Sequence, residues 1–188
     1  SVMDIAAVLF MDEARYDPSD PRWEGRDRIF FSAGHKAPAL YAALVERGYC
    51  TEERAVTLRR LGSPFQGHPH APALPGIEVS SGSLGQGLGI AVGSALAGRM
   101  AGAGWRVYCI TGDGEHQEGS IWEAAMAAGH YGLDSLCCIV DRNRLQIDGW
   151  TKDVMNIDPI ADKYRAFGWN VTEIDGHNMQ QILKAFEK

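Results

Sequence analysis

The sequence predicts an α/β domain with a mostly parallel, doubly wound sheet and helices on both faces. Three observations lead to this prediction. Short apolar runs at residues 107–111 and 136–140 are typical of buried strands. Between them, residues 118–130 have helical character, so the order is strand, helix, strand. The first run breaks at a Gly-Asp-Gly turn and the second at a polar Asp-Arg-Asn segment, as expected where parallel strands end at one edge of a sheet.

The elements before this unit follow in order from the N-terminus. A helix is predicted at the start of the chain from one apolar stripe, formed by Val2, Ile5, Ala6 and Leu9. The polar loop at residues 17–28 contains Asp-Pro-Ser-Asp-Pro and ends this helix. Helical segments are expected at residues 38–47 and 52–61. The loop at residues 62–76 then holds four prolines and two histidines.

Glycines mark the segment at residues 80–98. Each glycine inside a helix costs about 1 kcal/mol relative to alanine, so Gly85, Gly87, Gly89 and Gly93 need a reason. Close backbone approach is the expected reason, to a ligand near the N-terminal end and to another helix further along. After the central unit we predict a loop at residues 150–158, a helix at 160–167, a strand at 169–174 and a helix at 179–186.

Length and composition narrow the class of protein. The chain of 188 residues is long enough for one domain with a real core, and its net charge of −6 argues against a nucleic-acid surface. The longest weakly polar run, residues 84–97, is too short to span a bilayer, and no signal-like start is present. The cysteines lack metal-binding spacing. We therefore expect reduced thiols and a cytoplasmic protein with no membrane or nucleic-acid partner.

Polar groups follow the two central strands at the points where they end. Asp113 lies just past the first strand and Asn143 just past the second. Neighbouring strands lie about 4.8 Å apart, so a carboxylate, an amide oxygen and a carbonyl just after Asn143 can converge on a cation such as Mg²⁺. Gly112 and Gly114 leave backbone N–H groups open to a phosphate. Gly-Asp-Gly alone fits an ordinary turn; its pairing with Asn143 favours the metal site.

The wording of these motifs resembles a known family. Gly-Asp-Gly followed by Asn143 is similar to the diphosphate signature of thiamine-diphosphate enzymes, and GDGEHQEGSIWEA with DRNRLQIDG resembles transketolase. Residues 27–44, 68–97 and 167–178 resemble it as well, in the same order. The resemblance thus extends through most of the chain. It implies the thiamine-diphosphate-binding fold, with Mg²⁺, or Ca²⁺ as a substitute, beside the cofactor.

The resemblance also implies individual roles. Asp113, Asn143 and the Leu145 carbonyl match the metal ligands. Residues that match cofactor contacts are His35, Gly82, Ser83, Leu84, Gly112, Asp113, Gly114, Glu115, Asn143 and Ile147. His68 and His35 match the histidines that act near the substrate and the diphosphate; the local sequence alone leaves a capping or surface role for His35 equally open. The family usually has proline where Ser83 stands, a change that a backbone contact survives.

The implied activity is transfer of a two-carbon ketol unit from a ketose phosphate to an aldose phosphate. Residues 1–188 form one domain, the diphosphate- and metal-binding half of the site. A pyrimidine-binding C-terminal subunit or domain is expected to supply the other half, so this chain alone is expected to be inactive. Two motifs of the family, an upstream glycine-histidine-proline and a downstream histidine, have no match, and we expect a chain truncated at both ends.

The resemblance also implies a location for Glu118 and Glu123. Carboxylates on a helix are commonly solvated, whereas the family places both at a subunit interface, which implies a homo- or hetero-oligomer. Alternatives within the family are deoxyxylulose-phosphate synthase and dihydroxyacetone synthase; the Gln-Glu-Gly wording at residues 117–119 favours transketolase over the former. Two alternatives lie outside the family: a non-catalytic, regulatory domain that binds a metal-diphosphate, and a nucleotide phosphotransferase. The latter is disfavoured because no Gly-Lys-Ser/Thr loop occurs.

Overall fold

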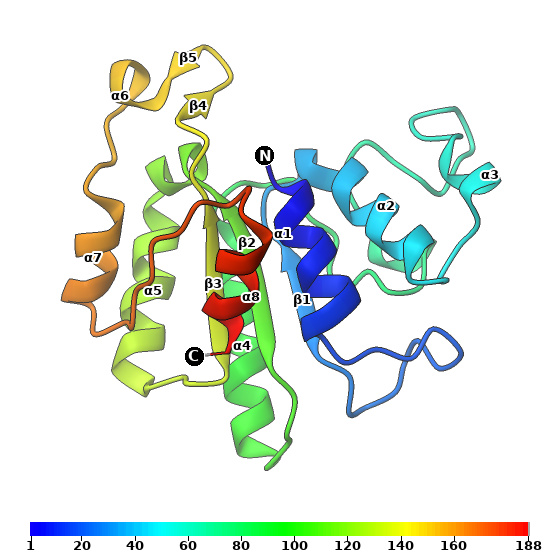
Figure 1. Ribbon diagram of the computed structural model, residues 1–188, viewed down its shortest axis with the longest axis horizontal. Helices are drawn as coiled ribbons and strands as arrows, with labels where there is room; N and C mark the ends of the chain where they lie inside the picture. The colour runs from blue at the N-terminus through cyan, green and yellow to red at the C-terminus, as the bar shows by residue number, and fades with distance from the viewer. Residues whose placement is uncertain (188) are drawn as a thin grey trace.

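The computed structural model describes residues 1–187 and contains a three-stranded parallel sheet in the order β1-β2-β3 (Figure 1). Its strands are β1 (Arg28–Phe31), β2 (Val107–Gly112) and β3 (Leu136–Asp141). The central strand β2 pairs with both neighbours, and its last residue, Gly112, lies opposite Asp141. Because the strands run the same way, their C-terminal ends share one edge, which we call the carboxyl edge.

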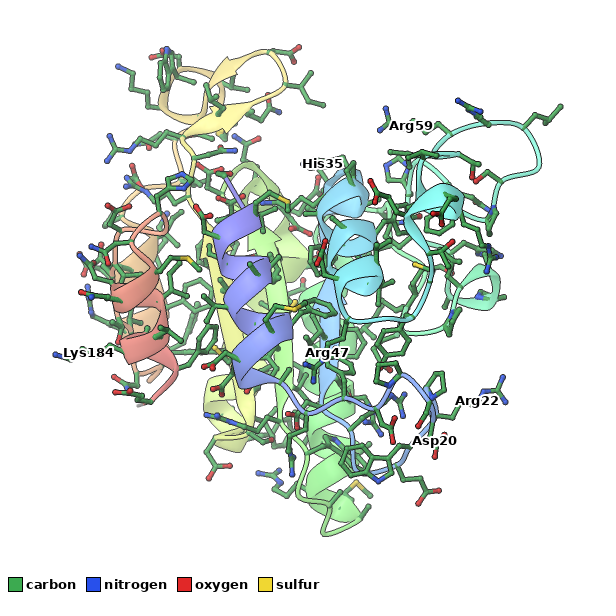
Figure 2. All side chains as sticks on the ribbon, turned by 45° about the vertical axis from the view of Figure 1, so that its right-hand side comes forward. Asp20, Arg22, His35, Arg47, Arg59 and Lys184 are labelled. Carbon is green, nitrogen blue, oxygen red and sulfur yellow. The ribbon has the colours of Figure 1, made fainter. Side chains whose placement is uncertain are left out.

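Helices cover both faces of this sheet (Figure 1). The first face carries α1 (Met3–Val8), α2 (Ala37–Glu46) and α8 (Met179–Phe186). The second carries α4 (Gln86–Met100), α5 (Gly119–Tyr131) and α7 (Ile160–Ala166). In Figure 2, α1 and α2 lie side by side over the first face. The predicted doubly wound α/β arrangement is confirmed.

Burial of the central strand β2 on both faces explains why its sequence is an unbroken apolar run. All of its residues are buried. Tyr108 and Ile110 pack into the core of the first face, whereas Val107 and Cys109 pack into that of the second. A strand covered on both sides has no polar face, as is usual for parallel sheets.

The remaining elements are short. They are the π-helical turn Leu9–Glu13, the 3₁₀ turns Gly34–Lys36, Ala71–Ala73 and Gly114–Gln117, the helices α3 (Glu52–Ala55) and α6 (Thr151–Val154), and a hairpin of β4 (Leu145–Gln146) and β5 (Gly149–Trp150). The hairpin and α6 project beyond the carboxyl edge (Figure 1). Across residues 1–187, no helix combines the length and the apolar character needed to cross a bilayer.

Three predicted elements need correction. The strand predicted at residues 169–174 does not form, because the Trp169 indole donates to the Ala125 carbonyl of α5 at 2.9 Å and the segment packs with the second-face core instead of extending the sheet. The helix predicted at residues 52–61 ends at Ala55 and continues as turns. The loop predicted at residues 150–158 contains the short helix α6.

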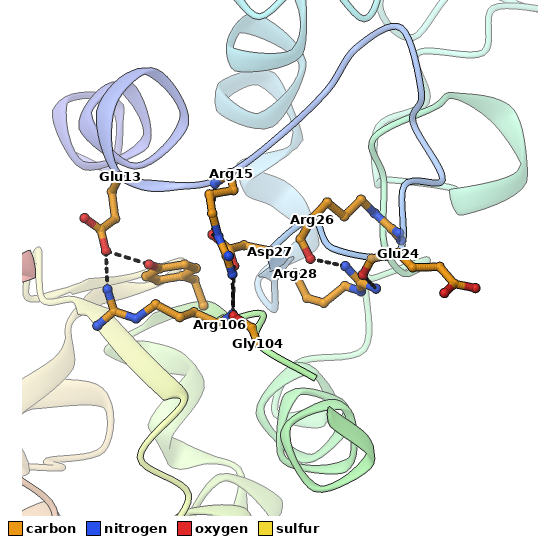
Figure 3. A network of polar contacts seen from close by, with 9 residues as sticks. Glu13, Arg15, Glu24, Arg26, Asp27, Arg28, Gly104 and Arg106 are labelled. Carbon is orange, nitrogen blue, oxygen red and sulfur yellow. Dashed lines mark hydrogen bonds and ion pairs between the residues drawn. The ribbon is translucent and has the colours of Figure 1, made fainter. Parts of the chain in front are cut away.

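A polar network fixes the opposite, amino-terminal edge of the sheet (Figure 3). Asp27, with 1% of its surface exposed, accepts hydrogen bonds from the backbone N–H of Arg15 at 2.9 Å and that of Arg106 at 2.7 Å. The Arg15 guanidinium also donates to it at 2.8 Å. Buried carboxylates need such donors. This one ties the N-terminal loop to the starts of β1 and β2, far along the strands from the carboxyl edge.

Candidate functional site

The Gly-Asp-Gly turn and the Asn143 loop meet at the carboxyl edge. Asp113 is 2% exposed, and its backbone N–H donates to the Asp141 carbonyl at 3.3 Å. One carboxylate oxygen of Asp113 accepts from the Arg144 backbone N–H at 2.7 Å, and the other from the Gly114 N–H at 2.9 Å. The carboxylate predicted as a metal ligand therefore bridges the loops that follow β2 and β3.

The other two predicted metal ligands belong to the second of these loops. Asn143 and Leu145 are exposed, and the Asn143 amide oxygen accepts from the Leu145 N–H at 2.9 Å. A Cβ added at Gly114 would lie 3.7 Å from the Leu145 carbonyl oxygen and 3.1 Å from the Gln146 side chain. Glycine at position 114 thus lets this loop lie directly against the turn.

The chemistry of this donor set suits a hard divalent cation. It consists of a carboxylate, an amide and a carbonyl oxygen, the ligands that Mg²⁺ and Ca²⁺ prefer. A carboxylate offers about four lone-pair positions, so the two hydrogen bonds to Asp113 leave capacity for a metal. Among residues 1–187, no group of three or more His, Cys, Asp or Glu side chains forms a metal cluster, so a cation here would need neutral oxygens beside Asp113. The residues fit the implied metal.

The expectation about the glycine amides is not met. The Gly112 N–H donates to Glu115 at 3.0 Å and the Gly114 N–H to Asp113, so both have protein acceptors instead of lying open to a phosphate. The 3₁₀ turn Gly114–Gln117 also separates the turn from α5, whose N-terminus begins only at Gly119. The physical reason is that the two nearby carboxylates outcompete water for these donors.

Glu115, predicted as a cofactor contact, is directed into the protein. It is 3% exposed. One oxygen accepts from the Ser32 hydroxyl and from the Gly85 backbone N–H at 2.8 Å; the other accepts from Gly112. These donors come from three separate segments. Both oxygens of the Glu115 carboxylate thus accept hydrogen bonds from the protein itself.

The two predicted histidines lie together with the glycine loop. A Cβ at Gly34 would lie 2.6 Å from the His68 ring and 2.8 Å from the Cα of Gly82. The turn with His35 at the start of α2 (Figure 2), the His68 loop and the loop at residues 82–84 therefore meet, and both rings are exposed. Desolvation, followed by the charge of Lys36, lowers the pKa of His35.

The loop at residues 82–84 also touches the start of α5. A Cβ at Gly85 would lie 2.7 Å from the Glu118 side chain, and the Ser120 hydroxyl donates to the Gly85 carbonyl at 3.1 Å. Ser83 is exposed and Leu84 half-buried. Glu118 and Glu123 are both exposed. The predicted contacts at residues 82–84 and the predicted interface carboxylate Glu118 thus lie on adjoining surfaces.

Ile147, predicted to contact the thiazolium ring, lies between the strands of the small hairpin. It is 96% exposed, and Leu145 and Trp150 nearby are also exposed. The structure brings the hairpin to the same edge as Asp113 through the contact with Gly114. Such high exposure of an apolar side chain fits a residue that contacts another molecule.

Sequence reasoning missed two buried groups at this edge. The Lys36 ammonium pairs with the Asp141 carboxylate, with only 9% and 7% of the side chains exposed, and the Ser1 hydroxyl donates to Asp141 at 2.7 Å. His116 is fully buried; its Nδ1 contacts the Gly112 carbonyl at 2.7 Å and its Nε2 the Tyr164 hydroxyl at 3.0 Å. Their closeness to the motifs in sequence was the only available signal.

Comparison with known proteins decides the family. The family model described as "Transketolase, thiamine diphosphate binding domain" matches residues 1–188. The chain belongs to the transketolase family. The family predicted from the motifs is thereby confirmed.

Two curated relatives of this transketolase-family chain are named as parts of larger enzymes. It is 46% identical to the 6-deoxy-6-sulfo-D-fructose transketolase subunit SqwG of Clostridium sp. (strain MSTE9), over 100% of this chain and 68% of that protein. It is 44% identical to one of the subunits of the apulose-4-phosphate transketolase of Phocaeicola vulgatus, over 99% of this chain and 66% of that protein. The chain therefore spans about two thirds of the length of these relatives.

Solved transketolases have the same fold. The transketolase of Leishmania mexicana superposes with a TM-score of 0.93 at 34% identity, covering 97% of this chain and 29% of that one. The transketolase of Campylobacter jejuni gives a TM-score of 0.91 at 34% identity, covering 97% and 30%. This transketolase-family chain thus corresponds to less than a third of those longer chains.

Proposed function

We propose that this chain is the diphosphate- and metal-binding half of a transketolase. The complete enzyme would transfer a two-carbon ketol unit from a ketose phosphate to an aldose phosphate. The observation that supports the proposal is the contact between the Gly-Asp-Gly turn, which holds Asp113, and the loop that holds Asn143 and Leu145, in a chain whose whole length matches the thiamine-diphosphate-binding domain of transketolase.

Each residue at the edge receives a role. Asp113 supplies negative charge to Mg²⁺, or to Ca²⁺ in its place, while Asn143 and Leu145 supply neutral oxygens. His35 donates an N–H of its ring to the diphosphate. When bound, thiamine diphosphate supplies the nucleophilic carbon and the electron sink for the carbon chemistry.

The remaining residues contact the rings or the sugar. Residues 82–84 offer backbone groups to the aminopyrimidine ring, and Ile147 offers an apolar side chain to the thiazolium ring. His68, exposed beside Gly34 and Gly82, orients the sugar and moves protons at its oxygens. The names of the two curated relatives, a sulfofructose transketolase and an apulose-4-phosphate transketolase, support an anionic sugar as substrate.

A partner is needed to complete this site. We assign the pyrimidine half to a C-terminal subunit or domain, and the naming of both relatives as subunits supports a separate chain. The surface of α4 and α5 offers room for it: an added Cβ at Gly89, Gly93 or Gly119 would meet nothing within 4 Å. Small residues beside exposed carboxylates allow close approach of another backbone, in a homo- or hetero-oligomer.

Reconstitution tests the proposal. The full-length protein containing this chain, mixed with its pyrimidine-binding partner, thiamine diphosphate and Mg²⁺, should transfer a ketol unit from xylulose 5-phosphate to ribose 5-phosphate. The chain without the partner should show no turnover. Turnover by the chain alone would refute the half-site assignment, and cofactor binding without any turnover in the mixture would favour a regulatory domain.

A further inference from the structure

We propose that Glu115 is a positioning residue, whose buried carboxylate holds the three candidate cofactor-binding segments in place without contacting the cofactor. The inference rests on the proposed function and deepens it. It concerns a side chain that motif comparison places among direct contacts, and it assigns that side chain a different task.

The three hydrogen-bond donors to Glu115 identify the segments. Ser32 follows β1 directly and precedes the turn with His35. Gly85 follows the loop at residues 82–84 and is the N-cap residue of α4. Gly112 ends β2 and precedes Asp113. One carboxylate therefore fixes the relative positions of the diphosphate histidine, the ring-binding loop and the metal-binding aspartate.

The local geometry makes this arrangement specific for a carboxylate. All three partners donate, and a carboxylate only accepts, so every contact is satisfied. Glutamine at position 115 would place an N–H₂ group against one of these donors. Within the described part of the chain, no Lys, Arg or His side chain forms an ion pair with Glu115, so the hydrogen bonds carry the whole task of stabilising it.

The contacts of Gly85 and Gly87 beside the Glu115 carboxylate explain why the sequence has glycine at these positions, although glycine is unfavourable in a helix. Gly85 has a φ of 83°, a conformation that favours glycine, and its N–H reaches Glu115 from there. A Cβ at Gly87 would lie 2.5 Å from the Ser32 side chain. The start of α4 is thus pressed against the end of β1, with the Glu115 carboxylate joining the two.

Asp27 provides a matched control. It is also a buried carboxylate, 1% exposed, with hydrogen bonds to backbone N–H groups, yet it lies at the amino-terminal edge of the sheet (Figure 3). Loss of either carboxylate should lower the melting temperature. Only the loss of Glu115 should weaken the cofactor site, because only its partners belong to that site.

The test compares Glu115→Gln and Asp27→Asn with the wild type in the full-length protein, together with its partner subunit where it has one. Thiamine diphosphate with Mg²⁺ is titrated calorimetrically at a temperature at which circular dichroism shows each variant folded. We expect Glu115→Gln to raise the Kd on the order of tenfold and Asp27→Asn to leave it within about twofold of the wild type. A Glu115→Gln variant that binds as tightly as the wild type would overturn the inference.

Hydrogen exchange gives a readout that needs no ligand. The Gly85 and Gly112 amides should exchange on the order of tenfold faster in Glu115→Gln and unchanged in Asp27→Asn. If Glu115→Gln fails to fold, Ser32→Ala removes one of the three hydrogen bonds and should still raise the Kd. An unchanged Kd in folded Ser32→Ala, with unchanged Gly85 and Gly112 exchange, would count against the role. Absence of binding by the wild type would sink the proposed function instead, while the exchange rates still decide the role of Glu115.

Discussion

Lys36 and Asp141 form an ion pair that is almost wholly buried beneath the candidate site. The ammonium of Lys36 passes Gly112, whose added Cβ would lie 3.8 Å from its Cε, before reaching Asp141. The pair therefore joins the turn after β1 to the end of β3, and Lys36 and Asp141 stand next to His35 and close to Asn143 in sequence. The buried Lys36 ammonium thus connects the turn that would bind the diphosphate to the loop that would bind the metal.

The first prediction follows from the burial of this pair. Removing one partner leaves an uncompensated buried charge, which costs about 3–5 kcal/mol. Lys36→Met should lower the free energy of unfolding by about 3 kcal/mol in urea denaturation. Arg165→Met is the control: Arg165 is 46% exposed and pairs with exposed Asp162 and Glu173, so its loss should cost less than about 1 kcal/mol. Equal, small losses for both variants would contradict the structural importance of the buried pair.

A second prediction concerns pH. The Gly112 carbonyl can only accept, so Nδ1 of His116 carries the proton, and the neutral ring accepts from Tyr164 at Nε2. Burial lowers the pKa of His116 from 6.5. The folded protein then binds fewer protons than the unfolded chain, so this stability is fully present above pH 6.5 and is lost as pH falls toward the lowered pKa.

Urea denaturation between pH 7.5 and 5 tests this directly. The contribution of His116 to the slope should be at most about 1.4 kcal/mol per pH unit. His116→Gln should flatten the pH dependence of stability, whereas His130→Gln, at a position outside the core, should keep the wild-type slope. A wild-type slope in His116→Gln would show that the buried ring does not titrate on unfolding.

The predictability of these residues depended on how local their partners are. Asp113 and Asn143 could be placed because each lies within two residues of the end of a strand, and the parallel order brings strand ends together. Lys36, by contrast, meets a partner 105 residues away, and Ser32 donates to Glu115 across 83 residues. Such pairs depend on the packed fold, and no spacing in one sequence reveals them.

The glycines of α4 differ in surroundings along a single helix. Gly87 faces inward, where an added Cβ would lie 2.6 Å from the Ser32 backbone, whereas Gly89 has nothing within 4 Å. The two positions are two residues apart and lie on different sides of the helix. One side of α4 therefore requires glycine at position 87 for packing against the end of β1, whereas glycine at position 89 lies on the opposite, outer side.

The third prediction contrasts these two glycines. Gly87→Ala should destabilise the chain by more than about 2 kcal/mol, since rigid backbone stands in the way. Gly89→Ala should stabilise the isolated chain by up to about 1 kcal/mol, because alanine favours a helix. Thermal denaturation of both variants measures this. Similar effects of the two substitutions would contradict the packing of α4 on β1.

Elements with long, regular patterns were predictable, whereas short or edge elements were not. The apolar runs of β2 and β3 and the alanine-rich α5 have bounds within two residues of expectation. The segment at residues 169–174 has strand-like composition, yet Trp169 anchors it to α5. A side chain that finds a buried acceptor outweighs β-propensity, which is weak and context-dependent.

Taken as a whole, the molecule has two unlike edges. The amino-terminal edge is closed by ion pairs around Asp27, and the carboxyl edge gathers polar loops beside an exposed apolar hairpin. On the adjoining surface, the N-cap residue Glu118 and the α5 residues Glu123 and Met126 are exposed. Trp122 of α5 is turned inward and donates to the His116 carbonyl at 2.9 Å. Trp122 therefore packs against the core of the second face.

The fourth prediction is about assembly. Glu118→Ala should reduce the mass measured by light scattering, or weaken binding to the partner subunit, because this carboxylate stands beside the cofactor loop on the proposed interface. Glu53→Ala, exposed on the distant α3, is the matched control and should change neither quantity. A strict monomer with or without the partner would contradict the interface.

We propose that Asp113 joins the diphosphate to the protein through a divalent cation. Calorimetric titration of thiamine diphosphate tests it most directly, with Mg²⁺ and with a chelator, in the wild type, Asp113→Ala and the exposed control Asp134→Ala. We predict binding by the wild type and Asp134→Ala only with Mg²⁺, and a loss on the order of a hundredfold or more in Asp113→Ala. Equal affinity of Asp113→Ala and wild type, or undiminished binding in chelator, would show that no metal bridge through Asp113 holds the diphosphate.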